Sequence, residues 1–177
     1  MDCDISQIYD NKPQLDPHPL SPYVAWAGER NRDAILEVLQ ERLPKSEGHV
    51  LEIASGSGMH LCYFAPHFQH LHFHPSDVDE GVFENIRKLQ REQGVSNLEA
   101  PVKFDLLSPD TWSNPSEQLF DFIISINILQ VAPFEVAEGI MKCSSKLLKS
   151  NGLLYMYGPF KVNGEFSSES NQEFDKK

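Results

Sequence analysis

The chain has 177 residues, enough for one domain with its own hydrophobic core. Its composition, 40% hydrophobic and 23% charged, is typical of a soluble globular domain. The formal net charge of −11 disfavours a long nucleic-acid interface, because such interfaces neutralise phosphates with clustered Lys and Arg. No apolar run approaches about 18 residues, so the sequence predicts no membrane-spanning segment. Because of the negative net charge, it also predicts no nucleic-acid partner.

The cysteines and the first residues indicate a cellular compartment. The N-terminal residues 1–4 are acidic and lack the charged-then-apolar plan of a secretory signal peptide. The three cysteines have no paired spacing, which favours reduced thiols over disulfides. We therefore expect a cytoplasmic protein.

Three segments are predicted along the chain. Residues 1–25 show no clear period and read as an irregular N-terminal arm, residues 26–160 as one Rossmann-like domain, and residues 161–177 as a polar C-terminal tail. The domain opens with a predicted amphipathic helix from Arg30 to Leu43, which Pro44 ends.

The next element carries the most information about function. A short apolar strand, His49 to Ile53, runs into the small residues Ala54 to Gly58, and a helix opens at Met59. Small side chains let the backbone come close to a ligand, and the free N–H groups at the start of the helix point to the same place. The turn predicts a nucleotide-type cofactor site, with a tight connection that binds nothing as the alternative.

The residue types in this turn discriminate between cofactors. A dinucleotide fingerprint wants glycine where Met59 stands, and a phosphate-binding Walker loop needs a lysine that is absent. The pattern acid-x-small-x-Gly-x-Gly, formed by Glu52, Ala54, Gly56 and Gly58, resembles the first motif of class I S-adenosylmethionine-dependent methyltransferases. That cofactor is a cation without phosphate, so a nearby carboxylate suits it.

Polar residues follow the next strands as well. Asp77 follows the predicted strand Leu71–Pro75, about 20 residues after the turn, where an acid can accept the ribose hydroxyls of an adenosyl group. Its alternative role is to cap the helix beginning near Glu80, for which Asp79 is better placed. Asp105 follows the strand 102–104 as a candidate acceptor for the adenine amino group, and Asn127 follows the strand 120–126. All lie at the predicted carboxyl edge of one sheet.

Several other polar residues have both a functional and a structural interpretation. Arg30 could pair with the carboxylate of the methionyl group, or it could be a solvent-exposed residue at the start of a helix. His60 is either a polar contact near the turn or a surface histidine. His70, His72 and His74 alternate as zinc ligands would on one strand, but no fourth ligand is evident, so we predict structural histidines and no metal site.

The second half of the chain completes the alternation of strands and helices. Helices are predicted over 80–93 and 133–149 and a fifth strand over 153–157, which together indicate parallel βαβ units. Nothing in the polar tail has strand character. The sequence therefore predicts an α/β fold, a Rossmann-like class I methyltransferase sheet that lacks its last C-terminal strands and leaves the fifth strand as an exposed edge.

A further pattern is carried by residues 29–31 with 35–36, and by residues 50–60, 64–67, 75–77, 127–133 and 157–160. On these residues the chain resembles the methyltransferase-like protein twenty-six family over about residues 10–175. The family is little characterised and occurs in bacteria and animals. The resemblance implies the methyltransferase fold and cofactor binding but no particular substrate. Members of the family usually continue by another helix and further strands.

We therefore expect an S-adenosylmethionine-dependent methyltransferase acting on a small molecule or a protein side chain. The alternative is a methyltransferase-fold protein without activity, a binding or regulatory module in a truncated form. A nicotinamide oxidoreductase is weakened by Met59. The predicted cofactor-binding residues are Glu52, Ala54, Gly56, Gly58, Asp77, Asp105, Asn127 and Arg30; no general base is predicted, because displacement at a sulfonium methyl needs mainly alignment and charge placement.

Overall fold

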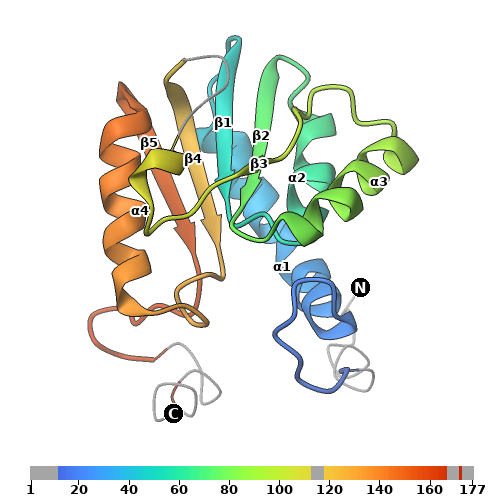
Figure 1. Ribbon diagram of the computed structural model, residues 1–177, viewed down its shortest axis with the longest axis vertical. Coiled ribbons are helices and arrows are strands. Elements are labelled where there is room, and N and C mark those ends of the chain that lie inside the picture. The colour runs from blue at the N-terminus through green and yellow to red at the C-terminus, as the bar shows by residue number, and fades with distance from the viewer. Residues whose placement is uncertain (1–11, 113–117, 167–171, 173–177) are drawn as a thin grey trace, which may run out of the picture.

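A computed structural model describes residues 12–112, 118–166 and 172 of the chain. Five parallel strands form one sheet in the order β3-β2-β1-β4-β5, with helices on both faces (Figure 1). This architecture confirms the predicted Rossmann-like α/β fold. The strands are β1 (Gly48–Ile53), β2 (Leu71–Asp77), β3 (Val102–Lys103), β4 (Phe120–Ile126) and β5 (Leu148–Tyr157). The helices are α1 (Pro22–Arg42), α2 (Met59–Phe64), α3 (Phe83–Gln93) and α4 (Phe134–Leu147), with the 3-10 turns η2 (Ala65–His67), η3 (Glu80–Val82) and η4 (Pro109–Thr111).

The strand order reverses beside β1. From β1 the chain adds β2 and β3 on one side of the sheet and then returns to place β4 and β5 on the other side. Glu52 is paired with Pro75 of β2, and Ile53 is paired with Ser125 of β4. The carboxyl ends of β1 and β4 are therefore neighbours at the switch point, the place where open α/β sheets bind ligands.

Two apolar layers sandwich the sheet. Helices α1, α2 and α3 pack on the face that carries Val50, Phe73 and Phe122. Helix α4 packs on the opposite face, against Leu51 and Ile123. Because both faces are buried, the central strands are almost continuously apolar, and a polar residue within them stands out.

Helix α1 begins eight residues before the predicted start at Arg30, so that prediction was wrong. The Ser21 hydroxyl accepts a hydrogen bond from the Val24 N–H at 3.1 Å, and Pro22 occupies the first helical turn. The irregular arm is thus shorter than predicted, and residues 1–11 lie outside the described residues. Although α1 has 21 residues, neither it nor another helix in the described part of the chain is long and apolar enough to cross a membrane.

Strand β5 is longer than predicted and begins at Leu148 rather than at residue 153. The pairing with β4 shifts between Phe120 and Phe122, where residues 149–152 make an irregular start to the strand. Among the described residues, β5 pairs with β4 alone, and Leu153 is 49% exposed. The tail does contain one short antiparallel bridge, between Val162 and Glu165; residues 167–171 and 173–177 lie outside the described residues.

Three imidazoles meet at the amino ends of β1 and β2. His49 Nδ1 lies 3.0 Å from His74 Nε2, and the His49 ring stacks on His72 at 5.1 Å between centroids. His70 is not part of this group, since its Nε2 lies 2.9 Å from the Pro44 carbonyl oxygen. No group of three His, Cys, Asp or Glu side chains within residues 12–112 and 118–166 is arranged to hold a metal ion. Burial, with a smaller contribution from His49, lowers the pKa of His74 to about 4.

The buried His74 predicts a loss of stability in acid. An unfolded histidine takes up a proton near pH 6.5, whereas the folded His74 resists protonation down to about pH 4. The free energy of unfolding therefore falls between these two pH values, by up to roughly 1.4 kcal/mol per pH unit for this group. We expect His74→Phe to reduce this loss in melting curves recorded from pH 7 to pH 4. The exposed His67, changed to Gln, serves as the control, and an unchanged pH dependence in His74→Phe would contradict the assignment.

Candidate functional site

The turn after β1 is held in an unusual backbone conformation. Ala54, Gly56 and Gly58 have positive φ angles of 56°, 52° and 78°. The Ser55 N–H donates to the Ser76 carbonyl at 2.8 Å, and the Ser55 hydroxyl accepts from the Ser76 N–H at 3.1 Å. The turn is therefore attached to β2 at the residue next to Asp77, through both the backbone and the side chain of Ser55.

Asp77 connects the end of β2 to the turn. Its Oδ2 accepts a hydrogen bond from the Gly56 N–H at 2.9 Å, and its Oδ1 accepts from the Asp79 N–H at 2.9 Å. A carboxylate offers about four acceptor sites, so two remain for a ligand. Asp79 caps the following η3 turn through the Gly81 N–H, as the alternative interpretation of these acids predicted. Gly56 and Asp77, predicted separately from the sequence, are thus in direct contact.

Gly58 is required by the packing of α3. A Cβ at this position would lie 2.8 Å from the Ile86 Cγ1 and 3.2 Å from the Ile86 Cα. Asn85, also on α3, donates from its side-chain amide to the Ser57 carbonyl at 2.7 Å. The lack of a side chain at Gly58 therefore lets α2 and α3 pack closely, and it also permits the backbone conformation of the turn. The sequence pattern marked the glycine but gave no sign of its partner.

Glu52 is buried inside the domain. Its side chain is 2% exposed on the α1 and α2 side of the sheet, and its Oε2 has no hydrogen-bond partner among the described residues. Burial, together with the nearby charge of Asp77, raises the pKa of Glu52 to about 8. The acid predicted as a ligand carboxylate is therefore mostly protonated at neutral pH in this structure. Its contact with a cofactor stays a prediction.

Helix α1 passes beside the start of α2. A Cβ on Gly28 would lie 1.8 Å from the Met59 Cε, so α1 touches the residue that follows the glycine turn. His60 is half-buried, with its Nε2 2.8 Å from the Asn31 Oδ1, and burial lowers its pKa to about 4. Arg30 itself is exposed, and its guanidinium lies 4.7 Å from the centre of the Trp26 ring. Its pairing with a ligand carboxylate stays a prediction.

The segment before α1 also reaches the turn. A Cβ on Gly56 would lie 3.4 Å from the Pro19 Cβ. The described part of the N-terminal arm, dark blue in Figure 1, accordingly lies at the carboxyl edge of the sheet. The sequence alone could not reveal this contact, because it joins residues far apart in the chain through an irregular segment.

The remaining predicted site residues end β3 and β4. The Asp105 carboxylate accepts hydrogen bonds from the Leu107 N–H and the Ser108 hydroxyl, both at 2.9 Å, and so also shapes the loop after β3. Asn127 has a positive φ of 55°, and its N–H donates to the Tyr157 carbonyl at 2.8 Å. The strand order places Asp105, Asp77, the turn and Asn127 in sequence along one edge of the sheet. Their contacts with an adenosyl group are predictions that the geometry permits.

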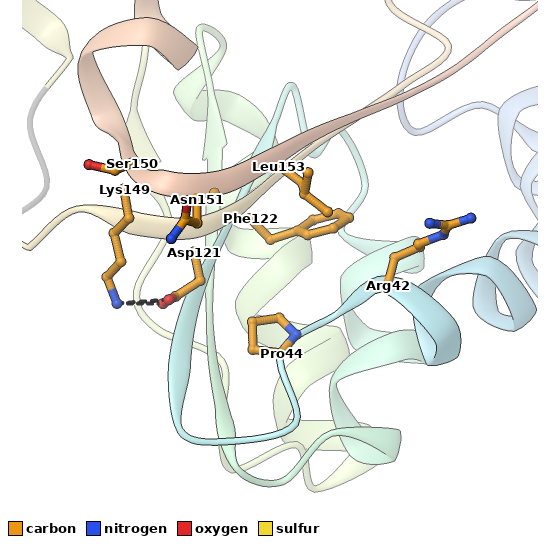
Figure 2. Close-up of a pocket in the computed structure, with 9 residues that line it drawn as sticks. Arg42, Pro44, Asp121, Phe122, Lys149, Ser150, Asn151 and Leu153 are labelled. Atoms are coloured by element: carbon orange, nitrogen blue, oxygen red, sulfur yellow. Dashed lines mark hydrogen bonds and ion pairs between the residues drawn. The ribbon is translucent and has the colours of Figure 1, made fainter.

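A hollow lies at the other edge of the sheet. It has a volume of about 520 Å³ and opens between the end of α1 and the starts of β4 and β5 (Figure 2). Lys149 points across it to Asp121, with a distance of 2.8 Å between Nζ and Oδ1. A smaller hollow of about 170 Å³ lies at the carboxyl ends of β4 and β5. The smaller one shares its edge with the glycine turn.

Residues 22–177 match the model of a family described as "Protein of unknown function (DUF938)". The chain belongs to this family. The family match supports neither a particular activity nor the narrower resemblance to the methyltransferase-like protein twenty-six family.

Several solved structures with a similar fold bear methyltransferase names. PKMT2 from Rickettsia typhi, solved in complex with AdoHcy, is 25% identical over 60% of this chain and 20% of its own, with a TM-score of 0.52. Coclaurine N-methyltransferase, bound to N-methylheliamine and SAH, is 17% identical over 72% of this chain and 35% of its own, with a TM-score of 0.58. The S-adenosylmethionine-dependent methyltransferase SibL, in its apo form, is 14% identical over 87% of this chain and 42% of its own, with a TM-score of 0.68.

These comparisons confirm the predicted sheet as one of methyltransferase type. The chain spans between 20% and 42% of the length of the three structures it matches. Their ligands and activities are therefore properties of those longer proteins.

The contact between Gly58 and Ile86 predicts a stability difference between two glycines. Gly94 ends α3 with a similar positive φ of 63°, but a Cβ there would meet nothing within 4 Å. Gly94→Ala should lose about 1–2 kcal/mol of unfolding free energy from backbone strain. Gly58→Ala should lose about 1–3 kcal/mol more, because it adds a methyl group to packed helices. Chemical denaturation of both variants checks this, and equal losses would rule out the packing role of Gly58.

The buried Glu52 predicts the opposite pH dependence from His74. Its pKa is about 8 in the folded protein and near 4.5 when unfolded, so unfolding between these values releases a proton. The free energy of unfolding should fall as pH rises through this window, by about 1.4 kcal/mol per pH unit. Glu52→Gln keeps the shape without the charge, so its advantage over the natural chain should grow from pH 5 to pH 8. The exposed Glu37, changed to Gln, is the control; parallel curves for Glu52→Gln and the natural chain would refute the buried neutral acid.

Proposed function

We propose that the chain is an S-adenosylmethionine-dependent methyltransferase that acts on a small molecule or a protein side chain. The observation that carries the proposal is the hydrogen bond between the Gly56 N–H and Asp77, which joins the glycine turn at the switch point of a parallel sheet to an acid at the end of the neighbouring strand β2. The similar structures support it, since two of them were solved with AdoHcy or SAH. We also propose that the chain is related to the methyltransferase-like protein twenty-six family and that it is located in the cytoplasm.

The residues at the carboxyl edge fit such a cofactor. The turn exposes backbone where side chains would fill the space, and the free acceptor sites of Asp77 suit the two hydroxyls of a ribose. The turn has no lysine, in agreement with a ligand that lacks phosphate. Asp105 would accept from the adenine amino group, and Arg30 would meet the methionyl carboxylate. S-adenosylmethionine supplies an activated methyl group when it is bound, so the protein's own contribution is to align an acceptor with that group and to keep water out.

Two acids in the same loop provide a matched test. Asp77→Ala removes the proposed ribose acceptor, and we expect it to weaken S-adenosylhomocysteine binding by roughly 1.5–3 kcal/mol, the range for hydrogen bonds to a charged group. Asp79→Ala removes only the cap of η3, and should lower the melting temperature with little effect on the affinity. Isothermal titration with S-adenosylhomocysteine, and with NAD as a second ligand, measures both effects.

The control for Asp77→Ala is its own melting curve, because Asp77 also supports the turn. A loss of affinity in a variant that is still folded at the titration temperature supports the ribose contact. If Asp79→Ala loses the affinity instead, the acid has been misassigned. If the natural chain is folded and binds NAD but not S-adenosylhomocysteine, the methyltransferase proposal fails.

A further inference from the structure

The smaller hollow has the position expected for a second ligand beside the cofactor. Its floor includes Ser125, near the end of β4, and Met156, near the end of β5. Ser125 is paired in register with Ile53, the last residue of β1 before the glycine turn. The hollow therefore begins one strand away from the proposed cofactor site and on the same edge of the sheet. Residues 158–166 contribute a further wall, which includes Phe160 and Phe166.

Two residues that line this hollow each carry a buried polar atom without a partner. The Ser125 Oγ and the Gln130 Oε1 have no hydrogen-bond partner among the described residues. Ser125 is 1% exposed. Six buried side-chain atoms of the described residues are unpaired in this way, and two of them belong to residues of this one hollow. Because an unpaired buried polar atom is destabilising, a ligand that reaches both atoms and pairs with them would recover that free energy.

The chemistry of the two atoms limits the ligand. An amide oxygen such as the Gln130 Oε1 only accepts hydrogen bonds, so the ligand must offer an N–H or O–H group. The Ser125 hydroxyl can donate or accept and therefore tolerates either partner. The ligand thus carries a donor on an otherwise uncharged body, because no Asp, Glu, Lys or Arg from the described part of the chain lines the hollow.

Size and charge limit the ligand further. A cavity of about 150 Å³ holds one benzene molecule, so 170 Å³ accommodates a single ring with a small substituent. The walls are largely apolar and aromatic, as Met156, Phe160 and Phe166 show. Burying a charged ammonium here would be unfavourable without a carboxylate partner.

We propose that this hollow binds the methyl acceptor, and that the acceptor is a neutral, ring-sized group bearing an N–H or O–H. This inference rests on the proposed methyltransferase function. In the reaction, a lone pair on the acceptor nitrogen or oxygen forms the bond to the methyl carbon as the carbon–sulfur bond breaks. The sulfur keeps the electron pair of the broken bond and becomes uncharged, and the acceptor's proton passes to water. Gln130 and Ser125 act as positioning residues that orient the donor group toward the glycine turn.

The experiment uses simple probes on the full chain. Phenol and aniline carry a ring with a donor, toluene lacks the donor, and benzylamine is a cation at neutral pH. Ligand-observed NMR titration with and without saturating S-adenosylhomocysteine gives each affinity. We expect phenol and aniline to bind at least threefold more tightly than toluene, and benzylamine to bind most weakly, because one neutral hydrogen bond contributes about 0.5–1.5 kcal/mol. Gln130→Leu should weaken phenol about fivefold without affecting toluene.

Matched variants separate recognition from folding. Gln40→Leu makes the same change at an exposed position of α1 and should alter no affinity. Ser125→Ala, a smaller change at the floor of the hollow, should weaken phenol to a lesser degree than Gln130→Leu. Equal binding of phenol, toluene and benzylamine would overturn the proposal, and so would unchanged phenol affinity in both hollow variants.

S-adenosylhomocysteine distinguishes this inference from the proposed function. If it binds while phenol and aniline do not, the acceptor site is wrong and the methyltransferase proposal stands. If it displaces phenol, the hollow belongs to the cofactor and the acceptor assignment is overturned. If phenol binds to a chain that does not bind S-adenosylhomocysteine, the proposed function fails and the acceptor role fails with it.

Discussion

The connection between the glycine turn and the end of β2 determines the arrangement of the whole carboxyl edge. It consists of the Gly56 N–H on Asp77 and the reciprocal contacts of Ser55 with Ser76. Three residues in this turn have positive φ angles, a conformation that is costly for a residue with a Cβ, as at Ala54. The neighbouring strand must therefore impose it. The same contacts align the start of α2, against which α1 packs, so that a few backbone hydrogen bonds orient two helices and the floor of the site.

Local chemistry explains the parts of the fold that were predictable. The bounds of β4 agree with the predicted strand 120–126, and α3 ends at Gln93, the predicted end of the helix 80–93, with the left-handed Gly94 after it. The start of α1 was missed because its signal is a Ser-Pro pair at residues 21 and 22, while the aromatic residues that follow are only half-buried and show no single apolar face. Periodicity identifies helices that bury one stripe, and the first turns of α1 do not.

The site was predictable as a list of residues but not as an arrangement. Asp77 and the glycines were identified from their places at strand ends, which follow from the topology of a parallel sheet. The burial of Glu52 was not predictable, because the sequence does not show on which side of the turn its side chain lies. The contact of Gly58 with Ile86 and that of Gly56 with Pro19 are likewise long-range. Ser125 and Gln130 had no distinguishing pattern, since only the pairing of β1 with β4 brings them to the edge of the cofactor site.

The buried ionisable groups have a joint consequence for the proton balance of folding. Glu52 makes the folded chain retain a proton that the unfolded chain releases above about pH 4.5, until its own pKa near 8 is passed. The unfolded chain protonates His60 and His74 below pH 6.5, whereas in the folded chain both side chains stay neutral down to about pH 4. Between pH 6.5 and 8 only Glu52 changes the proton balance of folding, and the free energy of unfolding falls as the pH rises. Below pH 6.5 the two histidines outweigh Glu52, and the free energy of unfolding falls as the pH decreases. These three side chains alone therefore give a bell-shaped stability profile whose summit lies on the acid side of neutrality, where folding exchanges almost no protons with the solvent.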